Sequence, residues 1–155
     1  MSKIEPLIKF GHIHFGENKV QEAVEKWSPV KAKFKNIKLH MVGKLQTNKV
    51  KYVIPVFDYL HSLDNIKLAK KISIEQKKLN KKIKIFIQIN FGNESQKGGI
   101  EPNELENFYK NCTTELGLDI IGLMSIPPND NQSNYYFSEM KKLKSLINTK
   151  ELSMG

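Results

Sequence analysis

Arginine is absent from this sequence, and lysine supplies all 25 basic residues behind the formal net charge of +9. Arginine is the preferred side chain for paired contacts to guanine and phosphate. The lysines are also scattered along the chain, apart from a group at residues 77–84. The positive charge therefore does not predict specific binding to a nucleic acid, and a basic nucleic-acid-associated protein is kept only as an alternative.

Cysteine and long apolar runs are equally scarce. Cys112 is the single cysteine, so no internal disulfide can form, which is typical of the reducing cytoplasm. Its spacing from Leu105, Phe108 and Tyr109 predicts a packed position on the apolar face of a helix. No segment approaches the ~18 apolar residues of a membrane span, and no signal-peptide pattern is present. We therefore expect a cytoplasmic protein with no membrane partner.

The chain alternates between short strand patterns and amphipathic helix patterns. Strands are predicted at residues 12–17, 37–43, 57–63, 83–90, 118–126 and 151–154. Between them, Asp64 is a candidate N-cap, Pro102 suits a first helical position, and Gly117 suits a helix end. The alternation predicts parallel βαβ units in one α/β domain over residues 1–155. A doubly wound sheet and a (β/α)8 barrel both fit, and two further strands would complete the barrel.

Polar residues gather where the predicted strands end, so they should face one rim of the sheet or barrel. His40 and His61 occupy similar places but lack a metal-binding motif, so hydrogen-bonded histidines are favoured over metal ligands. Asn18 can either cap a helix or contact a ligand. Gly98-Gly99 can approach a phosphate, and Glu94 can pair with Lys97 across a turn. Composition and spacing lead no further than an α/β domain with a polar rim.

Taken together, the strand ends resemble the pyridoxal-phosphate homeostasis proteins, a family similar in fold to the N-terminal domain of alanine racemase. The matching blocks are residues 15–23, 40–51, 61–64, 88–90 with 94–98, 122–128 and 152–155. The resemblance implies an incomplete (β/α)8 barrel of the fold-type III class, with about six parallel strands. It also implies pyridoxal 5'-phosphate (PLP) at the carboxyl-terminal rim.

The resemblance implies a carrier and buffer of PLP, not an enzyme, with transient contacts to PLP-dependent enzymes. It places Asn18 near the cofactor ring and Met124 in the lining of the pocket. Ser153, Met154 and Gly155 would lie at the edge of the phosphate site. No catalytic residue and no metal ligand is implied.

The resemblance also implies that parts of the family pattern are missing. The family's Schiff-base lysine lies in a Val-Ser-Lys-Thr type segment one helix before the block that begins at Phe15. Lys3 is only twelve residues before Phe15, so it is interpreted as a solvated helix residue. The phosphate-binding segment would continue beyond Gly155. We therefore expect a chain truncated at both ends that does not trap PLP covalently. A fragment of an amino-acid racemase and a truncated reading frame without independent function are the alternatives.

Overall fold

The computed structural model describes residues 4–91 and 98–154, and these form a six-stranded parallel sheet with helices. Its strands are β1 (His14–Glu17), β2 (Lys38–Met41), β3 (Tyr59–Leu63), β4 (Lys84–Gln88), β5 (Asp119–Ser125) and β6 (Glu151–Met154). Each lies inside one of the six ranges expected from the sequence, or coincides with it. The predicted alternation of strands and helices is confirmed.

The helical segments follow the same alternation. They are α1 (Glu5–Lys9), α2 (Val20–Lys33), η1 (Thr47–Lys49), α3 (Val50–Val56), α4 (Ile66–Leu79), η2 (Pro102–Glu104), α5 (Leu105–Lys110), the π-helix η3 (Asn111–Glu115) and α6 (Ser133–Leu146). Pro102 begins η2, and Gly117 follows η3 with a φ of +63°, as their positions predicted. The predicted cap at Asp64 is wrong by one residue. The side chain of Asn65 accepts the hydrogen bond from the Leu68 N–H at 2.8 Å.

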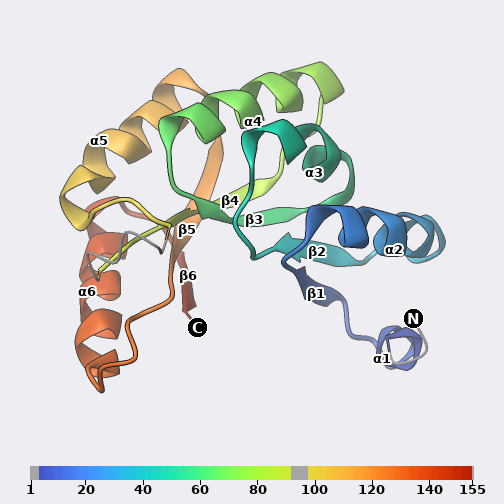
Figure 1. The fold of residues 1–155 in the computed structure, drawn as a ribbon, viewed down its shortest axis with the longest axis horizontal. Helices are drawn as coiled ribbons and strands as arrows, with labels where there is room; N and C mark the ends of the chain where they lie inside the picture. The colour runs from blue at the N-terminus through green and yellow to red at the C-terminus, as the bar shows by residue number, and fades with distance from the viewer. Residues whose placement is uncertain (1–3, 92–97, 155) are drawn as a thin grey trace.

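The order of the strands distinguishes the two architectures that the sequence left open. The sheet runs β1-β2-β3-β4-β5-β6, and every neighbouring pair is parallel. A doubly wound sheet reverses its strand order near the middle, whereas a barrel adds each strand on the same side. Figure 1 shows the helices along the outside of a curled sheet whose other face is open. The fold is an incomplete (β/α)8 barrel, as predicted.

The hydrophobic core lies between the outer face of the sheet and the helices. Helices α2, α3 and α4 each contribute buried apolar side chains, including Trp27, Ile54 and Ile72. Strand β4 is buried over most of its length, as is typical of a parallel strand. Cys112 is buried and free, and burial raises the pKa of its thiol to about 12. The expectation that this cysteine packs in the core is confirmed.

Some sequence-based predictions fall outside the described residues. These are the helical position of Lys3, the pairing of Glu94 with Lys97, and the phosphate contact of Gly155. Among the residues that the structure describes, no helix has both the length and the apolar composition needed to cross a membrane.

Candidate functional site

The carboxyl ends of the parallel strands meet at one rim of the half-barrel, and a close backbone contact joins the first two. The chain after β2 passes so near to Asn18 that a Cβ added at Gly43 would lie 2.8 Å from the Asn18 Cα. The Ser62 hydroxyl donates to the Gly43 carbonyl at 2.7 Å. The segments that follow β1 and β2 are therefore held to each other and to the end of β3, where the sequence predicted a polar rim.

A cavity of about 280 Å³ opens at this rim. Its lining combines an apolar wall with polar groups from the ends of β2, β4 and β5: Val42, Gly43, Lys44, Gln88, Ile89, Asn90, Gly98, Met124 and Ile126. The Gln88 amide donates to the Gly98 carbonyl at 2.8 Å and so fixes the chain where it returns to the rim. The volume of this cavity is close to the lower end of the range for small-molecule sites.

A second recess, of about 370 Å³, adjoins the start of α2. Its lining residues are Asn18, Lys19, Val20, Gln21, Glu22, Lys44, Gln46 and Lys49. Lys44 belongs to both linings, so the two recesses lie on either side of this lysine. Lys19 is paired with Glu22 of the same lining at 2.9 Å. The amines of Lys44 and Lys49 therefore supply the net positive charge that suits the rim to an anionic group.

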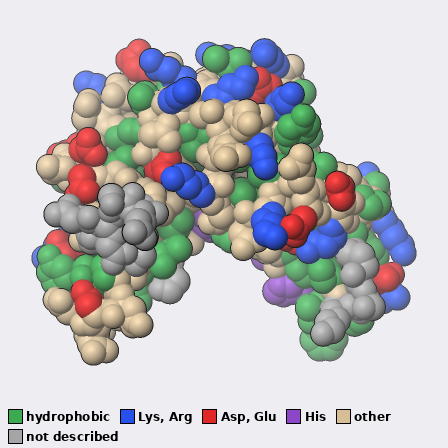
Figure 2. Space-filling view, in the orientation of Figure 1, with side chains coloured by type: hydrophobic (Ala, Val, Ile, Leu, Met, Phe, Trp, Pro, Cys, Tyr) green, Lys and Arg blue, Asp and Glu red, His purple; other side chains and the backbone are tan. Residues whose placement is uncertain are grey.

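A row of three histidines crosses the open face of the sheet. His14 Nδ1 lies 2.9 Å from His40 Nε2, and His40 Nδ1 lies 2.9 Å from His61 Nε2. His61 Nδ1 then lies 2.8 Å from Ser153 Oγ on β6. The curl of the sheet thus brings β3 and β6 into contact across the interior of the half-barrel. Figure 2 shows histidine side chains bordering the hollow between the two arms of the arc.

Aromatic stacking holds the two inner histidines in place. The His40 ring stacks on Tyr59 at 4.1 Å, and the His61 ring stacks on Phe86 at 4.3 Å. Burial, together with proximity to His14, lowers the pKa of His40 to about 4, although Asp58 acts in the opposite direction. Burial and proximity to His40 lower the pKa of His61 to about 4 as well. Both rings are therefore neutral near pH 7. The prediction that His40 and His61 are hydrogen-bonded is confirmed.

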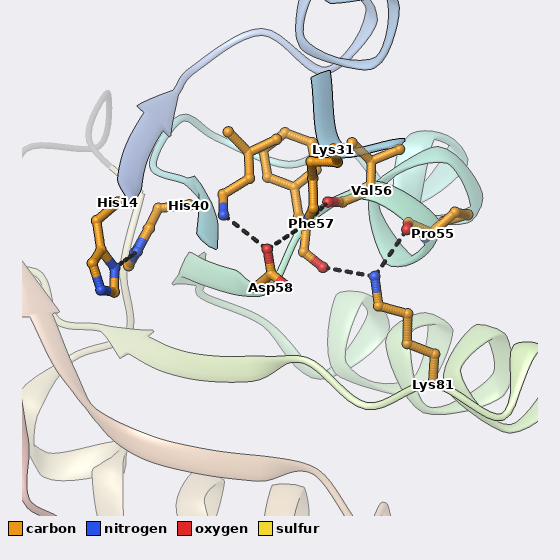
Figure 3. A network of polar contacts seen from close by, with 9 residues as sticks. His14, Lys31, His40, Pro55, Val56, Phe57, Asp58 and Lys81 are labelled. Atoms are coloured by element: carbon orange, nitrogen blue, oxygen red, sulfur yellow. Dashed lines mark hydrogen bonds and ion pairs between the residues drawn. The ribbon is translucent and has the colours of Figure 1, made fainter. Parts of the chain in front are cut away.

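A separate polar network lies at the other end of β2 and β3 (Figure 3). The Asp58 carboxylate accepts a hydrogen bond from Lys31 Nζ and one from the Leu39 N–H at 2.8 Å. Lys81 Nζ donates to the carbonyls of Pro55 and Phe57. Burial and the nearby Lys31 charge lower the pKa of Lys81. These contacts fix the entry into β3 and leave the rim free for a ligand.

The predicted cofactor residues are distributed over this arrangement. Met124 lines the rim cavity, and Asn18 lines the adjoining recess. Ser153 lies in register with Met124 but meets His61 through its hydroxyl. Met154 is partly exposed beside Ser125 on β5, and Gly155 lies outside the described residues.

Reasoning from the sequence missed two participants. Lys44 was visible in the block after the second strand, but only the fold places it between the two recesses. His14 was not singled out either. Its place on the first strand, parallel to the strands of His40 and His61, was the available signal that a third histidine could face the interior. Within residues 4–91 and 98–154, no group of histidine, cysteine and acidic residues could hold a metal ion.

Comparison with known proteins identifies the family. The model of the alanine racemase N-terminal domain matches residues 3–153. The pyridoxal phosphate homeostasis protein of Haemophilus influenzae is 36% identical over 166 residues, which cover all of this chain and 70% of that protein. The chain belongs to the pyridoxal phosphate homeostasis protein family. A second relative of the same name, from Aquifex aeolicus, is 34% identical over 91% of this chain and 65% of its own length. The chain spans about two thirds of the length of these curated relatives.

Solved structures show the same fold. PipY of Synechococcus elongatus without PLP superimposes with a TM-score of 0.90 at 28% identity, over 99% of this chain and 76% of PipY. PipY with PLP bound superimposes with a TM-score of 0.84 at 27% identity, over the same shares of both chains. The expected family and the incomplete barrel are both confirmed by these matches.

Proposed function

We propose that this protein binds PLP at the rim of its half-barrel and serves in PLP homeostasis as a carrier and buffer of the cofactor. The observation that carries the proposal is the likeness to PipY, which extends over 99% of this chain. One structure of PipY contains bound PLP. A cavity at the rim supplies a place for such a ligand in the present chain.

The residues around the rim cavity suit the two halves of PLP. Val42, Met124 and Ile126 provide an apolar wall for a pyridine ring, while Lys44 provides a cation for a phosphate. The passage of the chain at Gly98 is tight, because an added Cβ would lie 2.7 Å from Asp64 Oδ2. Gly98 lines the cavity with backbone atoms alone. Bound PLP supplies an electron-withdrawing ring and a reactive aldehyde.

Asn18, Met124, Ser153, Met154 and Gly155 are the proposed cofactor-binding residues. Asn18 and Met124 are supported by their places in the linings of the two recesses. Ser153 is supported by its register with Met124, which sets it beside the cavity wall. Met154 is in register with Ser125, one residue before the cavity-lining Ile126.

A non-catalytic role is part of the proposal, and the names of the relatives support it, because they describe homeostasis. We further propose that residues 1–155 act as one partial barrel domain in the cytoplasm, which the buried free thiol of Cys112 suits. Recipient PLP-dependent enzymes would be transient partners. Amino-acid racemization is the competing activity, and a chiral assay with D- and L-alanine in the presence of PLP tests it. Turnover would contradict the carrier function.

Pyridoxine 5'-phosphate is the sharpest probe of the binding site. It lacks the aldehyde, so it cannot react with the many surface lysines, and equilibrium dialysis then measures site binding alone. Ile126, which is 57% exposed at the cavity, can be changed to Glu with little effect on folding. A carboxylate there repels the phosphate, and we expect affinity to fall by about tenfold or more.

The matched control is Ile74→Glu, at a residue that is 48% exposed on α4 and belongs to neither of the two rim linings. This variant should bind pyridoxine 5'-phosphate as the unchanged protein does. Absence of saturable binding to the unchanged protein would refute the proposed function. Equal losses in both variants would refute the rim cavity as the site.

A further inference from the structure

The three histidines and Ser153 form an unbroken hydrogen-bonded chain that joins four strands. It begins at the exposed His14 on β1, passes through the half-buried His40, and reaches His61, whose side chain is buried. It ends at the hydroxyl of Ser153 on β6. The last contact is far from local, because His61 and Ser153 are 92 positions apart in the sequence.

When all three imidazoles are neutral, the hydrogen-bonded chain has only two arrangements in which every hydrogen bond runs in the same direction. Each neutral ring carries one N–H donor and one acceptor nitrogen. If His14 donates from Nδ1, then His40 and His61 must also donate from Nδ1, and Ser153 Oγ accepts. If Ser153 donates to His61, both inner rings donate from Nε2, and His14 Nδ1 accepts. The direction therefore decides whether the Ser153 hydroxyl hydrogen is free or is used by His61.

We propose that uptake of one proton by His14 fixes the direction of this chain, so that the Ser153 hydroxyl becomes a donor for an anion at the rim. A protonated imidazole is a donor at both nitrogens. His14 Nδ1 then donates to His40 Nε2, which forces both inner rings to carry their hydrogen on Nδ1. Ser153 accepts from His61, and its own hydrogen is free to point to a ligand.

The surroundings place the added proton at the His14 end. Burial and the neighbouring histidine keep His40 and His61 neutral, with the pKa of each lowered to about 4. His14 is exposed, and histidine is the side chain that changes charge between about pH 5 and 8. Other titratable groups near the histidines, within the part of the protein that the structure describes, include His12 before β1, Lys38 on β2, Asp58 just before β3, Tyr59 on β3 and Lys84 on β4. Asp58 is already paired with Lys31.

The position of Ser153 links the hydrogen-bonded chain of histidines to the rim. Ser153 is in register with Met124, which lines the rim cavity. A donor hydroxyl beside this cavity strengthens the binding of a phosphate or another oxyanion, because hydrogen bonds to charged groups are the stronger ones. Insofar as the anion is the phosphate of PLP, this inference rests on the proposed function.

The first test needs no ligand. Nitrogen-15 NMR of the imidazole side chains distinguishes rings protonated at Nδ1 from those protonated at Nε2. On lowering the pH from 8 to 5.5, His40 and His61 should both shift to the Nδ1–H form. In His14→Asn, an exposed change, that shift should disappear. Inner rings whose tautomers do not respond to pH in the unchanged protein would overturn the proposal.

The second test measures the binding of sulfate, whose charge does not change between pH 5.5 and 8. Its affinity for the unchanged protein, followed by NMR titration of residues at the rim, should rise by about tenfold as the pH falls. The rise should be lost in Ser153→Ala, which keeps the histidines. It should also be lost in His40→Phe, which retains the His14 charge but breaks the chain.

The His40→Phe variant separates the chain from simple charge attraction. If the pH dependence survives in a folded His40→Phe protein, the charge of His14 acts through space and the proposal is wrong. The Ser153→Ala variant gives the same decision should His40→Phe not fold, because it keeps the charge of His14 and removes only the hydroxyl. Sulfate affinity that still rises at low pH in this variant would contradict the proposal. Failure of pyridoxine 5'-phosphate to bind would refute the proposed function alone, since neither test above uses it.

Discussion

The backbone at Gly43 lies against Asn18 so closely that a Cβ at Gly43 would come within 2.8 Å of the Asn18 Cα. This contact joins the chain after β1 to the chain after β2. Asn18 lines one recess of the rim and Gly43 lines the cavity beside it. The geometry of both recesses therefore depends on a glycine that contributes no side chain.

Gly43→Ala should disturb the rim. The new methyl group must displace backbone atoms and not a flexible side chain, so we expect a loss of about 1–3 kcal/mol in the free energy of unfolding. Gly16→Ala is the matched control on β1, because its Cβ would meet Val42 at an ordinary 3.8 Å. Urea denaturation of both variants compares the two positions. Equal stability of the Gly43 and Gly16 variants would show that the contact with Asn18 is not a constraint.

The Glu17 carboxylate should be worth more to stability than its partly exposed position suggests. Trp27 is 1% exposed, and its indole N–H donates to Glu17 Oε1 at 2.7 Å. Glu17→Ala leaves that buried donor without its acceptor and should cost about 1–3 kcal/mol. Glu17→Gln keeps an acceptor for the indole N–H but loses the ion pair of Glu17 with Lys26, so it should recover part of the loss. Thermal unfolding, with Glu22→Ala as an exposed control, measures the difference; a Gln variant as weak as the Ala variant would contradict the hydrogen-bond explanation.

The sequence predicts the strands and helices of this protein because buried faces impose a regular spacing on apolar residues. It does not separate a half-barrel from a doubly wound sheet, since both contain the same alternation and differ only in strand order. The polar rim follows from parallel strands, and Asn18 and Met124 lie in recesses at this rim, although their contact with the cofactor stays a prediction. The contact between His61 and Ser153 cannot be inferred in this way, because it depends on the curl of the sheet between β3 and β6.

Asn65 should be the residue that stabilises the start of α4. Its side chain accepts from the Leu68 N–H, whereas Asp64 accepts from the Asn65 side-chain amide. Asn65→Ala should lower the free energy of unfolding by about 1 kcal/mol, and Asn65→Asp should restore it. Asp64→Ala should cost less, since the helix N–H keeps its acceptor. Chemical denaturation tests this order, which would be reversed if the cap were at Asp64.

Acid should destabilise the protein through its inner histidines. The pKa of His61 is lowered to about 4 in the folded protein. Below pH 6.5, the ordinary pKa of histidine, the unfolded chain therefore binds a proton that the folded protein does not bind. The stability contributed by the neutral ring is complete above about pH 6.5 and falls as the pH drops toward 4. The slope is at most about 1.4 kcal/mol per pH unit for His61, and it is smaller for the half-exposed His40 because solvent screens that ring.

His61→Asn isolates this contribution, because asparagine can still hydrogen-bond but does not titrate. Urea denaturation at pH 7, 6 and 5 should show a shallower loss of stability for this variant than for the unchanged protein. His12→Asn, at an exposed position outside the histidine row, should keep the original slope. If the His61 variant retained the full slope, the proton excluded on folding would belong to another group, and the neutral state of the buried imidazole would not be the source of acid sensitivity.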